Sequence, residues 1–567
     1  MAVLEQTTAR APARPISIPA RPRRPATPAW LQWAAPTLVA ALLAAVYVAI
    51  TPTSVDLAAH LFRAQMFSEH GFQIWNNYWY AGNEVLGYSV LFPAVSALPT
   101  PQLAAALATT GTATVFTPLA RRHFGDRAWV GALLFGAATA ADLYSGRLAF
   151  AFGALPALGA IAALDDDHPA LACVLALVSA LCSPVAALFA ALVAAGHALG
   201  GAIVAGRDRM PGRTTAETVR PVVRAVIPGT AVIVAALGPI LVISWMFPQG
   251  GVEPFAFSTM LPLLVICALA LVVLPRELVR LRAGVAVYGI ATLAVYLIPT
   301  PIGSNIARMA TFSALPLVTL VWWGRRPRAL ALVFLPLLYV AWSPAVRDGI
   351  AADIDESAST SYYAPLLHWL HRESAPGTTP FRIEVPFTQF HWEAYEVATR
   401  YSLARGWERQ LDIRYNPLFY EGRLTAARYR RWLHADGVRF VAISDATPDY
   451  SARAEVRLID SGLPYLHLVF RSQHWRVYRV ANATPIVQPP AVLQRLDADS
   501  LTMHVSRPEA FKVRVHFTPY WKLSEGSGCV APDGQWTKIT ARHAGELKLV
   551  PSFSLSRIGS TTPRCSS

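Results

Sequence analysis

The sequence predicts a polytopic α-helical membrane protein followed by a C-terminal α/β and β-sandwich region. Hydrophobic residues make up 54% of the 567 residues and charged residues only 15%, whereas a soluble domain carries about 25% charged residues. Apolar segments recur from residue 30 to residue 343, and several approach the roughly twenty residues that a membrane span needs. After residue 343 no apolar segment is long enough to span a membrane, and charged residues become common.

The N-terminal segment indicates on which side of the membrane the chain begins. Residues 1–29 combine repeated proline and alanine with five arginines, which is typical of a disordered basic tail in the cytoplasm. Residues 30–50 follow as the first span. No small-residue cleavage site precedes residue 56, so we expect this helix to be retained and not removed as a signal peptide. Residues 51–86 then form an outer loop.

The arginine clusters predict the remaining topology, because cytoplasmic loops carry an excess of Arg and Lys. Residues 87–100 are expected to form a short helix at the membrane surface. The further expected spans are 101–119, 129–144, 148–164, two short spans within 170–199, 225–247, 257–275, 284–300, 309–323 and 329–343. These about eleven spans leave every large arginine cluster on one side. The same clusters explain the net charge of +14, so nucleic acid is not an expected partner.

The C-terminal part is expected outside the cell membrane, in two subdomains. Residues 344–482 predict an α/β subdomain, with strands over 381–387 and 438–444 and helices over 391–404 and 424–435. Residues 483–567 show the alternating pattern of a small β-sandwich. Cys529 and Cys565 lie in this part, and they can pair if it lies in an oxidising compartment.

The outer loop and the residues after it carry the most unusual polar pattern of the membrane half. A helix would present Asp56, His60 and Arg63 on one face, since they are spaced at i, i+4 and i+7. Asp56 can act as the general base that deprotonates an acceptor hydroxyl, and His60 can orient it or hold a phosphate. The residues that follow can bind substrate: Trp75, Trp79, Tyr80, Glu84 and Tyr88. For Trp75, Trp79 and Tyr80 the alternative is the aromatic belt of any membrane protein.

Three arginines are expected at the outer side of the membrane half: Arg63, Arg147 and Arg308. A guanidinium group can bind two phosphate oxygens at once. For Arg147 and Arg308 the alternative is simple snorkelling to the membrane interface. An acid, several arginines and an aromatic loop together describe a site for a phosphorylated, lipid-borne substrate. The run 165–168 of three aspartates and a histidine is interpreted as a solvated turn, so no metal-ligand motif is predicted.

These features resemble the GT-C superfamily of membrane glycosyltransferases. Within it they are similar to bacterial membrane proteins labelled 6-pyruvoyl-tetrahydropterin-synthase-related and to YfhO-like proteins. The shared pattern is an acid, a histidine four residues on, an arginine, a tryptophan, Tyr-x-Gly, and a tyrosine five residues before a proline. In this sequence the matching residues are Asp56, His60, Arg63, Trp75, Tyr80 to Gly82, and Tyr88 to Pro93.

The resemblance implies an inverting sugar transfer from a polyprenyl-phosphate donor to an envelope glycan or lipid acceptor. Asp56 is the matching acid, and the reaction would take place on the outer face of the cell membrane. Many GT-C enzymes carry paired acids at this place, often with a divalent metal. Here the next acid is Glu69, so a divalent metal stays open and no cofactor is predicted.

Two other functions stay open at the level of sequence. A transporter or flippase of lipid-linked sugars would show internal repeats and broken polar helices, but no clear repeat is present and Asp142 is the main acid within a span. A non-catalytic scaffold would bind envelope glycans through aromatic residues of the C-terminal part, such as Trp392, Trp407 and Tyr415. The high alanine and arginine content is typical of a GC-rich bacterial genome.

Overall fold

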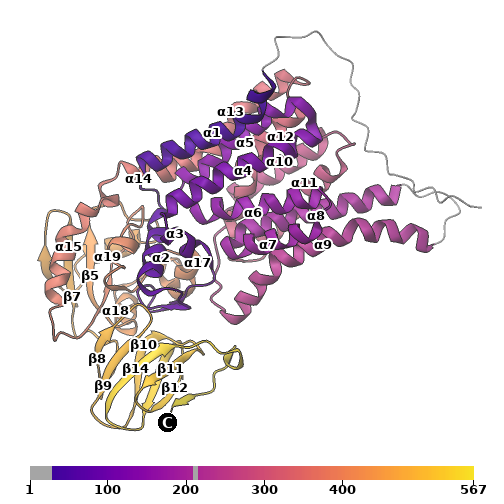
Figure 1. Cartoon of the computed structure of the whole chain (residues 1–567). Helices are drawn as coiled ribbons and strands as arrows, with labels where there is room; N and C mark the ends of the chain where they lie inside the picture. Colours follow the sequence, from indigo (N-terminus) through magenta and orange to yellow (C-terminus); the bar gives the residue numbers. More distant parts are fainter. Residues whose placement is uncertain (1–27, 208–214, 567) are drawn as a thin grey trace, which may run out of the picture.

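The computed structural model describes residues 28–207 and 215–566 (Figure 1). Nearly all of the predicted basic tail, and part of the arginine-rich loop near residue 210, lie outside the described residues. The described chain forms a helical bundle, an outer loop that includes two short helices, and a C-terminal region of strands and helices. The helices of the bundle are α1 (Ala29–Ile50), α4 (Pro101–Phe124), α5 (Ala128–Tyr144), α6 (Leu148–Asp165), α7 (Pro169–Cys182), α8 (Pro184–Arg207), α9 (Thr215–Met246), α10 (Phe257–Val273), α11 (Val279–Leu297), α12 (Arg308–Trp322) and α13 (Pro327–Pro344).

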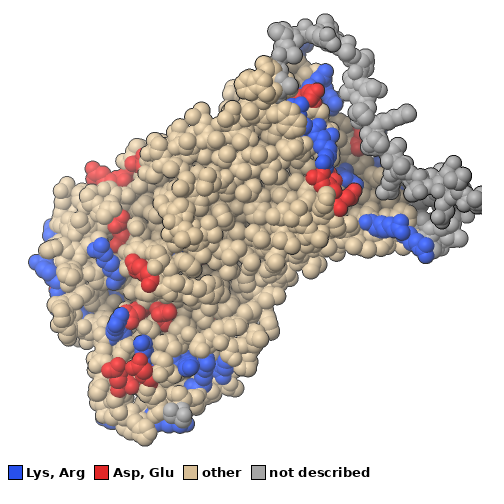
Figure 2. Space-filling view, in the orientation of Figure 1, with Lys and Arg blue, Asp and Glu red and all other residues tan. Residues whose placement is uncertain are grey.

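The bundle has the composition of a multi-pass membrane protein. Within the described residues, eight helical segments are long and apolar enough to cross a membrane; α4 and α5 count together as one of them, and α7 and α10 are shorter apolar helices. Figure 2 shows a broad uncharged surface around the bundle, with charged side chains gathered beyond its two ends. The predicted fold class is therefore confirmed as a mostly helical, membrane-compatible bundle with a strand-rich C-terminal region.

Small residues let the bundle helices approach one another closely. A Cβ atom added to Gly196 of α8 would lie 2.5 Å from the Cα atom of Gly284 in α11. Gly229 of α9 likewise lies against Ala194 and Ala198 of α8. In a membrane, where apolar side chains gain little by leaving lipid, such close backbone packing is a main source of helix association. The alanine-rich composition of this half is explained by this packing.

The outer loop follows α1 and lies at the end of the bundle that faces the C-terminal region (Figure 1). It contains α2 (Leu57–His70), the two-residue strands β1 (Trp75–Asn76) and β2 (Asn83–Glu84), and α3 (Phe92–Ala97). The two strands pair antiparallel, with Trp75 opposite Glu84. The helix α2 ends at Gly71, whose φ of +71° is the left-handed conformation that glycine adopts without strain.

The α/β unit begins after α13 and contains one five-stranded sheet of order β4-β3-β5-β7-β6. The strand β3 runs parallel to both β4 and β5, whereas β7 pairs antiparallel with β5 and β6. The sheet and its main helices are α15 (Thr360–Glu373), β3 (Arg382–Glu384), α16 (Glu393–Glu396), β4 (Ser402–Leu403), α17 (Arg409–Tyr415), α18 (Ala426–Ala435), β5 (Val438–Ser444), α19 (Arg453–Asp460), β6 (Leu466–Arg471) and β7 (Trp475–Val480).

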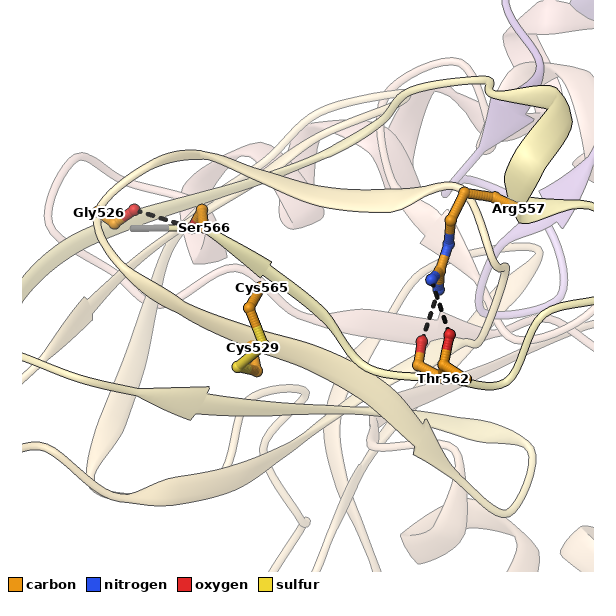
Figure 3. The surroundings of a disulfide bond; sticks show 6 residues. All are labelled: Gly526, Cys529, Arg557, Thr562, Cys565 and Ser566. Carbon is orange, nitrogen blue, oxygen red and sulfur yellow. Dashed lines mark hydrogen bonds between the residues drawn. A yellow bond between two sulfur atoms is a disulfide. The ribbon is translucent and has the colours of Figure 1, made fainter.

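The last part of the chain forms two four-stranded sheets, of order β10-β13-β12-β15 and β11-β14-β9-β8. Cys529 of β12 lies opposite Cys565 of β15, and the two cysteines form a disulfide (Figure 3). The bond therefore ties the final strand to its sheet. The strands are β8 (Ala491–Leu496), β9 (Leu501–Val505), β10 (Ala510–His516), β11 (Trp521–Glu525), β12 (Gly528–Asp533), β13 (Trp536–Ala541), β14 (Gly545–Pro551) and β15 (Arg564–Ser566).

Hydrogen bonds join the C-terminal region to one end of the bundle. Thr53, just after α1, donates to Asp353. Tyr520 Oη donates to the carbonyl of Met246 at the end of α9, at 2.5 Å. Arginines near the ends of α4, α10 and α12, and Arg207 at the end of α8, lie at the opposite ends of those helices. The bundle thus has one basic end and one end that carries the outer loop and the C-terminal region.

Candidate functional site

Asp56 stands directly before α2, and the helix presents His60 and Arg63 toward Tyr88. The ring of His60 lies 5.7 Å from that of Tyr88, and the Arg63 guanidinium lies 4.0 Å above the Tyr88 ring. Asp56 occupies the N-cap position of α2, but its side chain accepts no capping hydrogen bond. Its carboxylate is therefore not used to cap the first turn of α2.

The ends of three bundle helices bring further charges to Asp56. Asp142 lies in the last turn of α5, Arg147 directly before α6, and Arg308 at the start of α12. We call Asp56 and these three residues the Asp56 cluster. Within it, Arg147 Nη1 lies 3.5 Å from Asp142 Oδ1. Among residues 28–207 and 215–566, neither Asp56 nor Arg308 has an oppositely charged group within 4.0 Å, although each feels the charge of the other. Arg308 instead lies over the Phe150 ring.

Burial favours the protonated form of the Asp56 carboxyl over its charged form. Desolvation raises the pKa of Asp56 above its usual value, and the positive charges of Arg308, Arg147 and His391 only partly oppose this effect. The negative charge of Asp348 acts in the same direction as burial. A carboxylate with a raised pKa is a stronger base than an ordinary aspartate, which suits the removal of a proton from a hydroxyl group.

His60 is a neutral imidazole in this environment. Its side chain is only 1% exposed, and burial together with the charges of Arg63 and Arg308 lowers the pKa of His60 to about 3. Its two ring nitrogens are buried without a hydrogen-bond partner within the described part of the chain. The structure brings His60 next to Tyr88 and Phe92 but gives it no side-chain hydrogen bond to Asp56. A neutral ring cannot attract a phosphate by charge.

Arg63 lies beside an apolar groove that contains unused hydrogen-bond donors. Its Nη2 atom donates to Glu408 of the C-terminal region. Its Nη1 atom, and Nε2 of Gln73, are buried with no partner among the described residues. Both side chains line a groove of about 50 Å³ between α2 and residues 85–93. Apolar side chains form most of the remaining wall, including Phe62, Met66, Phe72, Leu86 and Val90.

The C-terminal region supplies residues to the same place. Tyr80 Oη donates to the carbonyl of Gly406 at 2.5 Å and accepts from the backbone N–H of Glu408 at 2.7 Å. His391 and Trp407 stack with ring centroids 3.6 Å apart, and the charge of His391 acts on Asp56. Glu253, from the loop between α9 and α10, lies within reach of the charges of Asp56 and Arg308, and burial raises its pKa. Sequence reasoning gave none of these C-terminal residues a role beside Asp56, because they follow it by more than 300 residues.

Three predicted site residues serve as contacts between the outer loop and the C-terminal region. Trp75 is buried in the core of the β-sandwich, where its ring lies 5.0 Å from that of Trp521. Trp79 donates to the carbonyl of Ala394 at 3.0 Å. Glu84 accepts from Thr518 at 3.1 Å, and burial raises the pKa of Glu84 to about 7. Trp75 and Trp79 are buried within the protein and are not exposed as the residues of an aromatic belt would be.

The Tyr-x-Gly motif has a structural reason. Tyr80, Ala81 and Gly82 all have positive φ angles, of 57°, 59° and 104°. A Cβ atom on Gly82 would collide with the Trp75 ring and lie 2.9 Å from Val515. Only glycine fits at this position, because the close approach leaves no room for a side chain and the φ of 104° disfavours one. The turn places Tyr80 against Gly406 and Glu408.

The residues around Asp56 do not fit a divalent metal. Among the described residues, no three His, Cys, Asp or Glu side chains converge in the manner of metal ligands. The groups whose charges act most strongly on Asp56 are two guanidinium groups, which repel a cation.

Comparison with known proteins adds no family assignment: no protein-family model and no curated protein matches the chain. The geometry alone indicates what the site can do. A carboxylate of raised pKa can accept a proton from a hydroxyl. A guanidinium group without an acidic partner can hold a phosphate.

Proposed function

We propose that the chain is a GT-C-like membrane glycosyltransferase that moves a sugar from a polyprenyl-phosphate donor to a cell-envelope acceptor. The observation that carries this proposal is the Asp56 cluster. A carboxylate and a guanidinium group, each without an ion-pair partner among the described residues, influence each other by charge where the bundle, the outer loop and the C-terminal region meet. A site of this kind is completed by a substrate that brings both a hydroxyl group and a phosphate.

The reaction is a single displacement at the anomeric carbon of the donor sugar. The acceptor hydroxyl oxygen forms a bond to that carbon while the bond from the carbon to the phosphate oxygen breaks. Asp56 takes the hydroxyl proton, and polyprenyl phosphate leaves with the electron pair. Attack from the side opposite the leaving group inverts the anomeric configuration, as the resemblance to the GT-C superfamily implies.

The arginines would stabilise the leaving phosphate. Arg308 has no acidic partner among the described residues, so its guanidinium is available to bind phosphate oxygens as charge develops on them. Arg147 is partly neutralised by Asp142 and would add charge at longer range. Arg63 and Gln73 have unused donors at the apolar groove, which supports a role in holding the head of the lipid donor.

The proposed topology puts this site on the outer face of the cell membrane. Arginine clusters lie at the opposite end of the bundle, and the positive-inside rule would place that end in the cytoplasm. The disulfide between Cys529 and Cys565 supports an oxidising, extracytoplasmic compartment for the C-terminal region.

The test is a transfer assay in membranes that contain the wild-type chain or Asp56→Asn. A panel of radiolabelled polyprenyl-phosphate sugars is supplied, and consumption of the donor is measured with and without a chelator. We expect Asp56→Asn to lower transfer by about 10²–10⁴-fold at unchanged expression, which is the usual contribution of a general base. Asp126→Asn is the matched control, since Asp126 is an exposed acid at the opposite end of the bundle.

Undiminished transfer by Asp56→Asn would refute the role of Asp56. If the wild-type chain consumed no donor of the panel, the transferase proposal itself would lose its support, and transport of lipid-linked sugars would become the function to test. A loss of activity caused by the chelator would contradict the conclusion that the site does not fit a metal.

A further inference from the structure

The loop between β14 and β15 exposes apolar side chains beside the end of a membrane helix. Leu555 is 72% exposed and Phe553 is 40% exposed. Exposed apolar side chains are common singly, but these two lie in one short segment, residues 552–563, which we call the docking loop. In Figure 1 the corresponding yellow loop of the sandwich lies directly below the end of α9.

Two arginines hold the docking loop in a defined shape. Arg557 donates through Nη1 to Thr562 Oγ1 at 3.0 Å and through Nη2 to the Thr562 carbonyl at 2.6 Å (Figure 3). Arg564 donates to the carbonyl of Ser552 at 2.9 Å. The disulfide of Cys565 fastens the strand that follows the loop. The loop is thus braced at both ends, although Leu555 and part of Phe553 stay exposed.

An aromatic cluster joins the docking loop to the end of α9. The Phe247 ring lies 5.2 Å from the Tyr520 ring and 5.8 Å from the Phe553 ring. Tyr520 Oη donates to the carbonyl of Met246, the last residue of α9. The loop therefore stands at the level at which this candidate span ends.

The last turns of α9 expose a continuous apolar face at the same level. Leu241 and Val242 are exposed, and the Trp245 side chain is 65% exposed. The segment 219–246 is among those long and apolar enough to cross a membrane, so lipid covers this face. Tryptophan at the end of a span marks the headgroup layer. Phe553 packs against Phe247, the residue that follows α9, and so lies at this same level.

We propose that the docking loop inserts Phe553 and Leu555 into the lipid headgroup layer beside α9, so that the β-sandwich rests on the membrane that its own chain spans. The occupant of this surface is the bilayer, because the loop packs against the end of a candidate span whose exposed apolar face lipid would cover at the same level. Side chains that lie in this layer reach about 5–10 Å into the boundary between headgroups and acyl chains. The inference does not depend on the chemistry at Asp56.

Membrane docking of the sandwich would also steady the outer loop. Thr518, two residues before Tyr520, donates to Glu84 of β2, and Trp75 of β1 lies in the sandwich core. The contact with lipid is thereby linked through the sandwich to the segment that follows Asp56 and α2. A loose sandwich would leave that segment without support on one side.

The test uses the full chain in lipid nanodiscs that hold one copy each. A fluorophore that responds to its environment is attached to Leu555→Cys or to the control Val492→Cys; the parent chain gives the background from its native cysteines. Val492 is 53% exposed on β8 of the same sandwich, and Figure 1 places β8 on the side away from α9. Both positions are exposed, so neither substitution should disturb folding.

We expect a nitroxide quencher carried near the headgroup end of a lipid chain to reduce emission at position 555 several-fold more than at position 492. Soluble iodide should give the reverse order. Equal quenching by the lipid-borne nitroxide at both positions would overturn the proposal. Strong iodide quenching at position 555 would likewise overturn it, and would leave the docking loop as a surface for a protein partner or a second copy of the chain.

Discussion

Two clusters of arginine and acid in this molecule are built in opposite ways. In the α/β unit, Arg405 is 1% exposed and donates to Asp412 at 2.6 Å and to Glu455 at 3.2 Å. Its guanidinium also lies between the rings of Phe387 and Phe419. In the Asp56 cluster, neither Asp56 nor Arg308 has an ion-pair partner among the described residues.

The difference separates a cluster that serves the fold from one that we propose to be completed by a ligand. Removing a charge from water costs several kcal/mol unless a partner of opposite charge and hydrogen bonds offset it. Carboxylates of the chain itself offset this cost for Arg405. For Asp56 and Arg308 the described residues supply only attraction at longer range, which is consistent with the proposed substrate.

The largest expected effect concerns the Arg405 cluster, in which the charges are paired. Arg405→Gln leaves the carboxylates of Asp412 and Glu455 buried without their guanidinium, and breaking such a pair costs about 3–5 kcal/mol. Urea unfolding of the full chain, followed by proteolysis within the α/β unit, measures the loss. Arg495→Gln is the control, because the pair of Arg495 with Asp497 is exposed and worth at most about 1 kcal/mol. Equal destabilisation by both variants would contradict a structural role for the Arg405 cluster.

In the Asp56 cluster, a substitution of Arg308 should lower activity and leave stability nearly unchanged. Arg308→Gln removes the guanidinium proposed to stabilise the leaving phosphate, and loss of one such group lowers kcat by about 10²–10³-fold. The unfolding midpoint should stay close to that of the wild type, since Arg308 forms no ion pair with a described residue. Transfer assays and unfolding are measured on the same preparation. A large fall in stability with normal kcat would make Arg308 a structural residue like Arg405.

The smallest expected effect is a shift of pH dependence. Asp56 must be ionised to act as a base, so transfer should fall as the pH drops through its pKa. Burial raises that pKa, and the acid limb of the kcat/KM profile should lie above the value of an ordinary aspartate, about 3.9. Arg308 lowers the pKa of Asp56 by its charge, so Arg308→Gln should move the limb to higher pH. A limb that stays in place would show that the base is another group.

The sequence predicted those parts of the site that depend on local spacing or on charge. The interval between Asp56, His60 and Arg63 indicated one helix face, and α2 spans residues 57–70. The arginine pattern put Arg147 and Arg308 on the same side as Asp56, and the structure places all three near one another. Both inferences need only the helical repeat and the positive-inside rule.

Other features depend on contacts that no spacing reveals. The sequence pattern predicted Trp75, Trp79 and Glu84 as ligand-binding residues, but their burial results from domains that begin roughly 270 to 410 residues later. The helical pattern over 391–404 yields only the four-residue α16, because His391 has a φ of +58° and residues 402–403 join the sheet as β4. Some helix ends also differ from the prediction: α4 ends at Phe124, whereas the predicted span ends at residue 119.

The burial of the outer loop has a consequence for how the chain is made. Asn77 Nδ2 donates to the carbonyl of Asp497, 420 residues further along the chain, and Trp75 needs the strands of the sandwich around it. At about 5–20 residues per second, a ribosome takes roughly 20–85 s to synthesise that distance. Until then the loop lacks these partners. The packing of the segment that follows Asp56 and α2 is therefore completed among the last events of synthesis, and a half-made chain would carry the Asp56 cluster beside an unsupported loop.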